Sequence, residues 1–230
     1  IVGVVIPLED KSPDAGIAGL VALVKPDMER VNQMILSRTG SDVTMIPEVG
    51  KALKKFCDAG LIAAGHDYAL GGMQLPCLIE KAGFAWFKGA NVGTSAYPFL
   101  TIGNANTLLK CGTPEQIEQF VKPMLAGRFF GTMCLSEPQA GSSLSDIATR
   151  AEVQSDGSYR LRGNKMWISG GEHELSENII HLVLAKVPGP DGKLIAGVKG
   201  ISLFIVPKFL VNDDGSLGAR NTLSCGSIEH

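Results

Sequence analysis

The 230-residue sequence lacks the features that mark several large classes of protein. Its five cysteines are far apart without a C-x-x-C pair, and its histidines are not spaced to complete a zinc site. We therefore expect free thiols in a reducing compartment and no metal. No apolar run reaches the roughly 18 residues needed to cross a bilayer, and no basic segment precedes an apolar signal region. These absences predict a soluble, cytoplasmic protein without a membrane partner.

An excess of charge of one sign is also missing. The formal net charge is −2, and the charges do not form a long block of either sign. Because nucleic-acid binding usually requires a basic patch, we expect no nucleic-acid partner. The 28 glycines and 12 prolines are spread along the chain, which indicates no low-complexity linker. The remaining composition, 45% hydrophobic and 19% charged, is that of an ordinary globular protein.

Helical spacing of apolar residues dominates the first part of the chain. Thr113, Pro114 and Gln116 form a strong helix start, because threonine caps the helix, proline suits its first position and glutamine closes a capping box. Gly60 is placed to end an earlier helix. The predicted helices cover residues 19–37, 47–59, 75–92, 97–110 and 114–127.

Strand signals with short turns dominate after residue 128. Asp156 and Gly157 are typical of a hairpin turn between two of the strands. Helices followed by strands predict an α+β fold, with an N-terminal helical region and then an antiparallel, barrel-like β domain. The predicted strands cover residues 129–135, 147–153, 159–161, 166–168, 179–185 and 201–206.

Two stretches of this β region suit a flat polar ligand. The apolar run that begins at residue 131 breaks at Ser136 into a proline and glycine turn rich in hydroxyls and backbone donors. Trp167 and Ser169 lie two residues apart, which places them on one face of the predicted strand. An indole can stack on a flavin ring while hydroxyls bind its nitrogens. The alternative is that Trp167 packs in the core and Ser136 only forms a turn.

The same stretches resemble the signatures of the acyl-CoA dehydrogenase family. Residues 133–143, MCLSEPQAGSS, are similar to a strand ending in T-E-P-x-A-G-S, and residues 163–169, GNKMWIS, are similar to G-x-K-x-W-I-[ST]. Residues 200–207, GISLFIVP, resemble a later strand of the same domain. The resemblance covers roughly residues 47–230. The variants GGEHEL at 170–175 and SIEH at 227–230 resemble the branch that contains 3-methylmercaptopropionyl-CoA dehydrogenases.

This resemblance implies FAD-dependent α,β-dehydrogenation of an acyl-CoA thioester. It also implies a homo-oligomer and an electron-transfer flavoprotein or similar acceptor as partner. Ser142 is expected near the pantetheine of acyl-CoA. Ser136 and Ser169 stand where many members have threonine, so the hydroxyl is kept. The flavin contacts carried over from the family are Met133, Leu135, Ser136, Trp167, Ile168 and Ser169.

The family places its catalytic base in a C-terminal helical bundle. That glutamate removes the α-proton while a hydride leaves the β-carbon, which is a general-base role. We expect the base beyond His230, with no catalytic residue and no helical bundle within these 230 residues. Two alternatives stay open: a non-catalytic truncated or fused fragment of such an enzyme, and a flavoprotein oxidase of the same fold.

The front of the chain departs from this resemblance. Residues 1–49 are similar to the N-terminal helical segment of bacterial polyprenyl diphosphate synthases. Prenyl transfer needs D-D-x-x-D motifs to bind magnesium, and this chain has only Asp213 and Asp214 without the following acid. We therefore expect no prenyl-transfer chemistry. The predicted divisions are a helical leader at 1–49, a helical domain at 50–128 and the β domain at 129–230.

Overall fold

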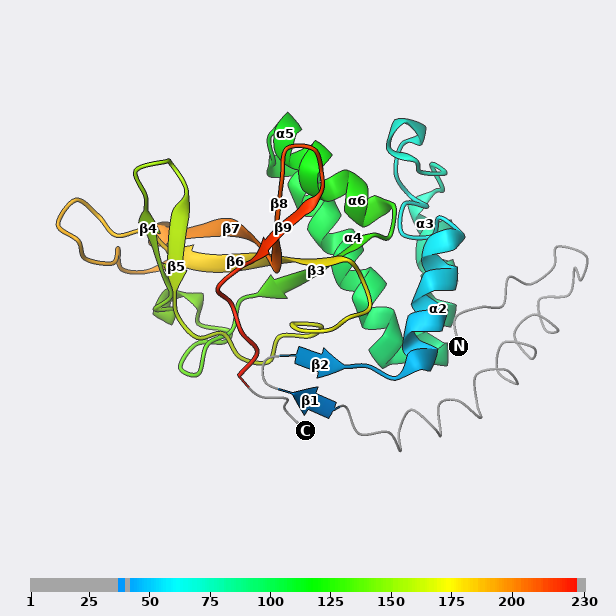
Figure 1. The fold of residues 1–230 in the computed structure, drawn as a ribbon, viewed down its shortest axis with the longest axis horizontal. Coiled ribbons are helices and arrows are strands. Elements are labelled where there is room, and N and C mark those ends of the chain that lie inside the picture. The colour runs from blue at the N-terminus through cyan, green and yellow to red at the C-terminus, as the bar shows by residue number, and fades with distance from the viewer. Residues whose placement is uncertain (1–36, 40–41, 227–230) are drawn as a thin grey trace, which may run out of the picture.

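The structure, a computed structural model, describes residues 37–39 and 42–226 (Figure 1). Most of the predicted leader and of its helix over residues 19–37 lies outside the described residues, so both stay predictions. The short strands β1 (Ser37–Thr39) and β2 (Asp42–Thr44), which the sequence pattern did not indicate, pair antiparallel ahead of the first described helix.

The helical region forms as the apolar spacing predicts. In α2, Val49, Leu53 and Phe56 recur on one face and are buried. Gly60 follows α2 with φ +70°, a left-handed conformation that glycine adopts without strain, which confirms its predicted role. The helices are α2 (Pro47–Asp58), α3 (Cys77–Ala90), α4 (Val92–Cys111), α5 (Pro114–Gln116) and α6 (Lys122–Leu125), with a 3-10 turn η1 (Tyr68–Leu70).

The capping box at Thr113 is present, but the helix after it is not continuous. Thr113 accepts from the Gln116 N–H at 3.3 Å, and the Gln116 side chain accepts from the Thr113 N–H at 3.0 Å. A π-helical turn, η2 (Ile117–Val121), then separates α5 from α6. Pro123 has no N–H to donate to the preceding turn, which favours such an interruption. Gly127, at φ +74°, ends the region where the sequence predicts.

Five of the described strands form one sheet, in which β6 is the central strand. Along one edge β6 pairs in parallel with β3 and then, at Lys186, with β4; along the other it pairs antiparallel with β7. The strands are β3 (Phe129–Cys134), β4 (Arg150–Val153), β5 (Tyr159–Arg162), β6 (Asn178–Lys186) and β7 (Ile201–Pro207), with 3-10 turns η3 (Leu144–Asp146) and η4 (Val198–Gly200).

The α+β class is confirmed; the predicted antiparallel pairing holds for β4–β5 and β6–β7, whereas β6 pairs in parallel with β3 and β4. Parallel strands need a long crossover, and residues 135–177 supply one between β3 and β6. The hairpin predicted at Gly157 is present, since β4 and β5 pair antiparallel across it. Strands β8 (Phe209–Val211) and β9 (Leu217–Arg220) form a separate hairpin. The strands of the described ranges therefore make an open sheet and two hairpins rather than a closed barrel.

Helix α4 packs against β3 and bonds the first half of β6, whereas β4 and β5 lie at the end of the sheet away from the helices (Figure 1). Phe130, Ile180 and Leu182 belong to the core shared with the helices. Asn104 of α4 donates to the Ile180 carbonyl at 2.8 Å, and a Cβ at Gly131 would lie 2.6 Å from that Asn104 amide. This close approach fixes the end of β3 relative to α4. None of the helices described here is long and apolar enough to cross a bilayer.

Candidate functional site

The segment after β3, residues 135–143, forms a tight turn that we call the proline turn. The Glu137 N–H donates to the Ala140 carbonyl at 2.7 Å, and the Ala140 N–H donates to the Glu137 carbonyl at 3.0 Å. Pro138 suits the position between them because its ring presets the backbone angle of a turn. The turn ends the strand and directs Glu137 inward, where only 2% of the residue is exposed.

The buried Glu137 carboxylate has donors on both oxygens. Its Oε2 accepts from the Ala148 N–H and from Gln139 Nε2, each at 2.7 Å. Its Oε1 accepts from the Thr149 N–H at 3.1 Å and from the Thr149 hydroxyl at 2.5 Å. Burial alone would raise the pKa of Glu137, but bonds from Ala148, Lys165 and Thr149 outweigh it and lower that pKa to about 2. Glu137 is therefore a structural anion rather than a proton acceptor.

Lys165 joins the proline turn to the segment over residues 163–171, which we call the tryptophan turn. Its ammonium lies 2.7 Å from Glu137 Oε1 and donates to the Leu135 carbonyl at 3.1 Å. The next residue, Met166, donates its N–H to the Ser136 carbonyl at 3.0 Å. The two motifs singled out in the sequence thus meet in space through one ion pair and two bonds to backbone carbonyls.

The tryptophan turn is not the strand that the sequence predicts over residues 166–168. Trp167 has φ +57° and Gly170 has φ +64°, so the backbone turns instead of extending. The bonds that Lys165 and Met166 make with the proline turn bind this segment to a loop rather than to a strand ladder. Trp167 and Ser169 consequently do not share one face of a strand, and that expectation is wrong.

A large open cleft of about 1910 Å³ receives the tryptophan turn. Trp167, with 62% of its surface exposed, lines this cleft together with Ile168 and Ser169. Met133 instead lines a second pocket of about 420 Å³ beside α4. Three further predicted contacts are absent from the cleft wall among the described residues: the half-buried Leu135 and Ser136 and the exposed Ser142. The structure thus brings Leu135 and Ser136 to the base of the tryptophan turn without placing them on the cleft.

A second buried carboxylate, Glu172, holds the far end of the tryptophan turn. Its side chain is 1% exposed and binds the Lys208 ammonium and, at 2.9 Å, Arg220 Nη2. Lys208 also donates to the His173 carbonyl at 3.0 Å. These cations come from the junction of β7 and β8 and from β9, so the turn is tied to the last described hairpin.

Two buried histidines lie in this region, and both are neutral at physiological pH. Burial and the Lys208 charge lower the pKa of His181 to about 4; the same causes, with His181 as a third, lower that of His173 to about 3. The Leu175 N–H donates to His173 Nδ1 at 3.2 Å, so the neutral ring carries its proton on Nε2.

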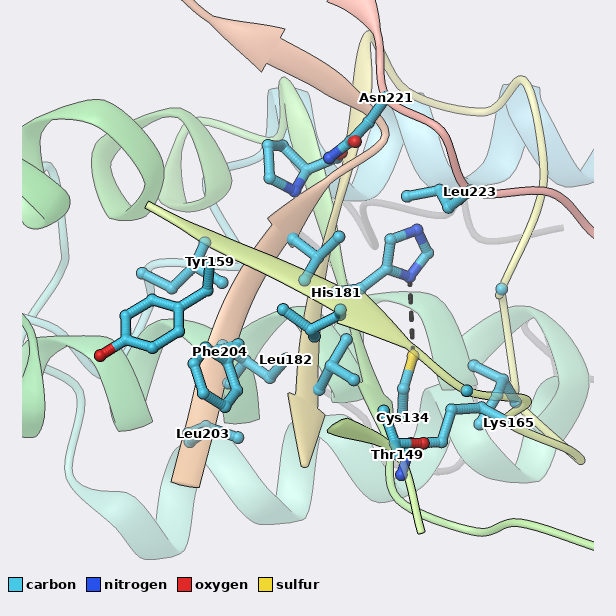
Figure 2. A pocket seen from close by; sticks show the side chains of 18 of the residues that line it. Cys134, Thr149, Tyr159, Lys165, His181, Leu182, Leu203, Phe204, Asn221 and Leu223 are labelled. Carbon is cyan, nitrogen blue, oxygen red and sulfur yellow. Dashed lines mark hydrogen bonds between the residues drawn. The ribbon is translucent and has the colours of Figure 1, made fainter. Parts of the chain in front are cut away.

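Figure 2 shows His181 facing the Cys134 sulfur inside the large cleft, with Lys165 and Thr149 nearby. The Cys134 sulfur lies 3.8 Å from His181 Nδ1, and the Thr132 hydroxyl lies 2.8 Å from the same nitrogen. Burial raises the pKa of the Cys134 thiol, so the sulfur stays protonated beside a neutral imidazole. This arrangement is not an activated nucleophile and base.

Four groups that organise the site were not predicted from the sequence: Glu137, Lys165, Glu172 and Lys208. Glu137 and Lys165 lie within the two quoted motifs, and that position could have indicated their role. Glu172 and Lys208 lie in no local sequence pattern that would indicate their pairing. Over the ranges that the structure describes, three or more His, Cys, Asp or Glu residues do not gather where they could hold a metal ion.

The sequence is similar to known acyl-CoA dehydrogenases. The family model for the acyl-CoA dehydrogenase middle domain matches residues 132–226. A 3-methylmercaptopropionyl-CoA dehydrogenase of Ruegeria pomeroyi is 42% identical over 188 residues, which are 81% of this chain and 31% of the relative. A butyryl-CoA dehydrogenase of Syntrophomonas wolfei is 38% identical over 192 residues, 83% of this chain and 31% of the relative.

The fold is also shared with solved structures. An acyl-CoA dehydrogenase of Bacillus anthracis complexed with FAD superposes with a TM-score of 0.63 at 23% identity, covering 87% of this chain and 32% of that one. At this identity the likeness concerns the fold alone. The chain spans about a third of the length of these curated relatives. Residues 132–226 are therefore similar in sequence to the middle domain of acyl-CoA dehydrogenases.

Proposed function

We propose that this chain supplies the flavin-facing half of an FAD-dependent enzyme that oxidises an acyl-CoA thioester to its α,β-enoyl form. The observation that carries the proposal is the tryptophan turn, which is bound to the proline turn and leaves Trp167 exposed in the cleft. A left-handed conformation is unfavourable for a bulky side chain and persists mostly where function requires it. A flat aromatic cofactor is the ligand that an exposed indole covers best. The acyl-CoA dehydrogenases among its relatives support the same class of substrate.

Each predicted contact has a role in holding FAD. Trp167 would cover the ring by stacking, and Ile168 would support the apolar side of the same surface. The Ser169 hydroxyl would donate a hydrogen bond to the polar edge, and the Ser136 hydroxyl would do so only after a shift of the proline turn toward the cleft. When bound, FAD supplies the hydride acceptor that protein side chains lack. Backbone groups of Met133 and Leu135 would complete the cofactor contacts, and the exposed Ser142 would contact the pantetheine arm of the substrate.

Proton abstraction from the thioester needs a carboxylate that is free to accept a proton. Glu137 is bound by five donors, with a pKa of about 2, and Glu172 is bound to Lys208 and Arg220. Glu137, so stabilised as an anion, is a poor base, and the Glu172 carboxylate is occupied by its two cations. We propose that the base is a glutamate from the part of the longer protein that this chain does not include.

The second pocket suits the acyl chain. Its volume is about 420 Å³, and apolar side chains of Phe84, Phe99 and Leu182 line it. Met133, which we place against the flavin, also lies on its wall. An acyl chain in this pocket would present its first carbons near the end of β3, where the proline turn begins.

The remaining parts of the proposal concern the whole protein. An electron-transfer flavoprotein or a similar acceptor would reoxidise the flavin, and the enzyme would act as a homo-oligomer in the cytoplasm. The same experiment tests two alternatives. One is an oxidase of the same fold, in which oxygen is the electron acceptor, and the other is a fragment that binds FAD without catalysing the reaction.

The test is flavin binding and turnover by the full-length gene product. We expect visible flavin absorbance in the purified protein and reduction of an artificial electron acceptor on addition of acyl-CoA. Trp167→Ala should weaken FAD binding, whereas Trp86→Ala, which removes a comparably exposed indole from α3, should not. A protein that takes up no FAD would refute the proposal. Turnover with oxygen alone would favour the oxidase, and FAD binding without turnover would favour the fragment.

A further inference from the structure

The tryptophan turn is held at both ends by buried carboxylates. Near its start, Lys165 binds Glu137; directly after it, Glu172 binds Lys208 and Arg220. We propose that Glu137 and Lys165 are positioning residues, which fix the turn so that Trp167 and Ser169 stand ready for the flavin beside Ser136. This inference rests on the proposed function.

The geometry points to positioning because Trp167 has little packing of its own. Its side chain is 62% exposed, so burial does not fix the indole. Other groups of the turn must therefore hold its position. These are the Lys165 ammonium and the Met166 N–H, which both donate to backbone carbonyls of the proline turn. A preorganised turn binds a ligand more tightly, because less ordering remains to be done on binding.

The surroundings of Glu137 are built for this ion pair. A Cβ at Gly163 would lie 2.2 Å from the Thr149 hydroxyl oxygen, and that hydroxyl binds Glu137 at 2.5 Å. Glycine at position 163 thus allows the chain to pass close enough for Lys165, two residues later, to reach Glu137. The motif spacing G-x-K therefore follows from the position of Glu137 in the other motif.

An ion pair is a costly way to stabilise a fold. Desolvation of two charges offsets most of their attraction, so apolar side chains would stabilise a buried contact equally well. What the pair adds is geometric: Lys165 reaches two acceptors, Glu137 Oε1 at 2.7 Å and the Leu135 carbonyl at 3.1 Å, in one arrangement. The pair thereby sets the position of one turn relative to the other.

The experiment compares Lys165→Met with Lys186→Met in the full-length protein. Lys186 is also buried, at 5% exposure, but its ammonium donates to the Ser145 carbonyl, outside both turns. We expect Lys165→Met to raise the Kd for FAD about tenfold or more, since small misplacements of binding groups weaken sites by such factors. Lys186→Met should leave the Kd within about twofold, and Lys165→Arg should restore most of the affinity because it keeps the charge.

A second readout does not require the cofactor. With Trp86→Phe, Trp167 is the only tryptophan of these 230 residues. Once any tryptophan elsewhere in the apoprotein is also replaced by Phe, the fluorescence anisotropy of Trp167 reports the mobility of the turn. Lys165→Met should lower this anisotropy, while Lys186→Met should leave it unchanged. If the Glu137–Lys165 pair stabilised only the fold, the anisotropy of Trp167 would be the same in the two lysine variants.

The outcomes separate the inference from the proposed function. A wild-type protein without flavin affinity would overturn both. A wild type that binds FAD, with equal Kd values and anisotropies in the two variants, would overturn the positioning role alone. If Lys165→Met does not fold, Glu137→Gln/Lys165→Met removes both charges together and the same comparison is made with that variant.

Discussion

Acid should destabilise this fold through its two buried neutral histidines. The folded protein holds the pKa of His181 at about 4 and that of His173 at about 3, whereas an unfolded histidine titrates near 6.5. Between these values the unfolded chain binds more protons than the folded one. Stability from the neutral rings is therefore complete above about pH 6.5 and is lost as the pH falls toward the folded values.

The size of the effect follows from the pKa difference. Each histidine contributes a slope of up to about 1.4 kcal/mol per pH unit within this window. At about pH 5.5, one unit below the unfolded pKa, the two rings together should cost about 3 kcal/mol of unfolding free energy. That is a large share of the 5–15 kcal/mol typical of a domain. Glu137 does not add to this loss, because its pKa of about 2 places its own effect below about pH 4.5.

Urea denaturation at several pH values measures the slope directly. His181→Asn removes one titrating ring and should roughly halve the loss between about pH 6.5 and 5.5. The same variant should also be less stable at neutral pH by about 1–3 kcal/mol, because His181 bonds the Thr132 hydroxyl. A slope equal in His181→Asn and wild type, or a wild type that gains stability in acid, would contradict the reasoning.

Three further predictions follow from particular contacts. Gly163→Ala should cost about 1–3 kcal/mol of unfolding free energy because its Cβ would meet the Thr149 side chain, whereas Gly141→Ala, with open space around it, should cost little; thermal denaturation compares them. Trp167→Asn should stabilise the apoprotein by up to about 1 kcal/mol, because asparagine tolerates the left-handed conformation at this position. The same variant should bind FAD more weakly. Urea denaturation measures the first effect and flavin titration the second, and a loss of stability would count against backbone strain at this position. Gly103→Leu should narrow the pocket beside α4 and lower kcat/KM more for long than for short acyl-CoA, and an equal loss for both would remove that pocket from the acyl site.

The features that the sequence predicted well depend on neighbours along the chain. The capping box at Thr113, the left-handed Gly60 and the hairpin at Gly157 each need only a few consecutive residues to form. The pairing direction of β3 and β6 needs the route of 43 intervening residues (135–177), which no local pattern records. Periodicity therefore predicted the elements and the α+β class but not the parallel ladders.

The candidate site was predicted in part for the same reason. The motifs contained Trp167 and Ser169, but the apolar run of residues 166–168 is also typical of a strand. What turns it into an exposed loop is the contact of Lys165 with Glu137, 28 residues earlier in the chain. Likewise, Glu172 and Lys208 are 36 residues apart, so their pairing could be found only in three dimensions.

The pairing of β3 with the later strand β6 also constrains the order in which parts of the chain can fold. Strand β3 ends at Cys134, but its hydrogen-bonding partner begins only at Asn178, so β3 stays unpaired on that edge while the crossover is synthesised. At typical translation rates that interval lasts roughly 2–9 s, whereas local helices form in microseconds or less. During this time α4 is the surface available to cover Phe130 and its neighbours. Early docking of β3 on α4 would protect an apolar strand from association with other chains until β6 emerges.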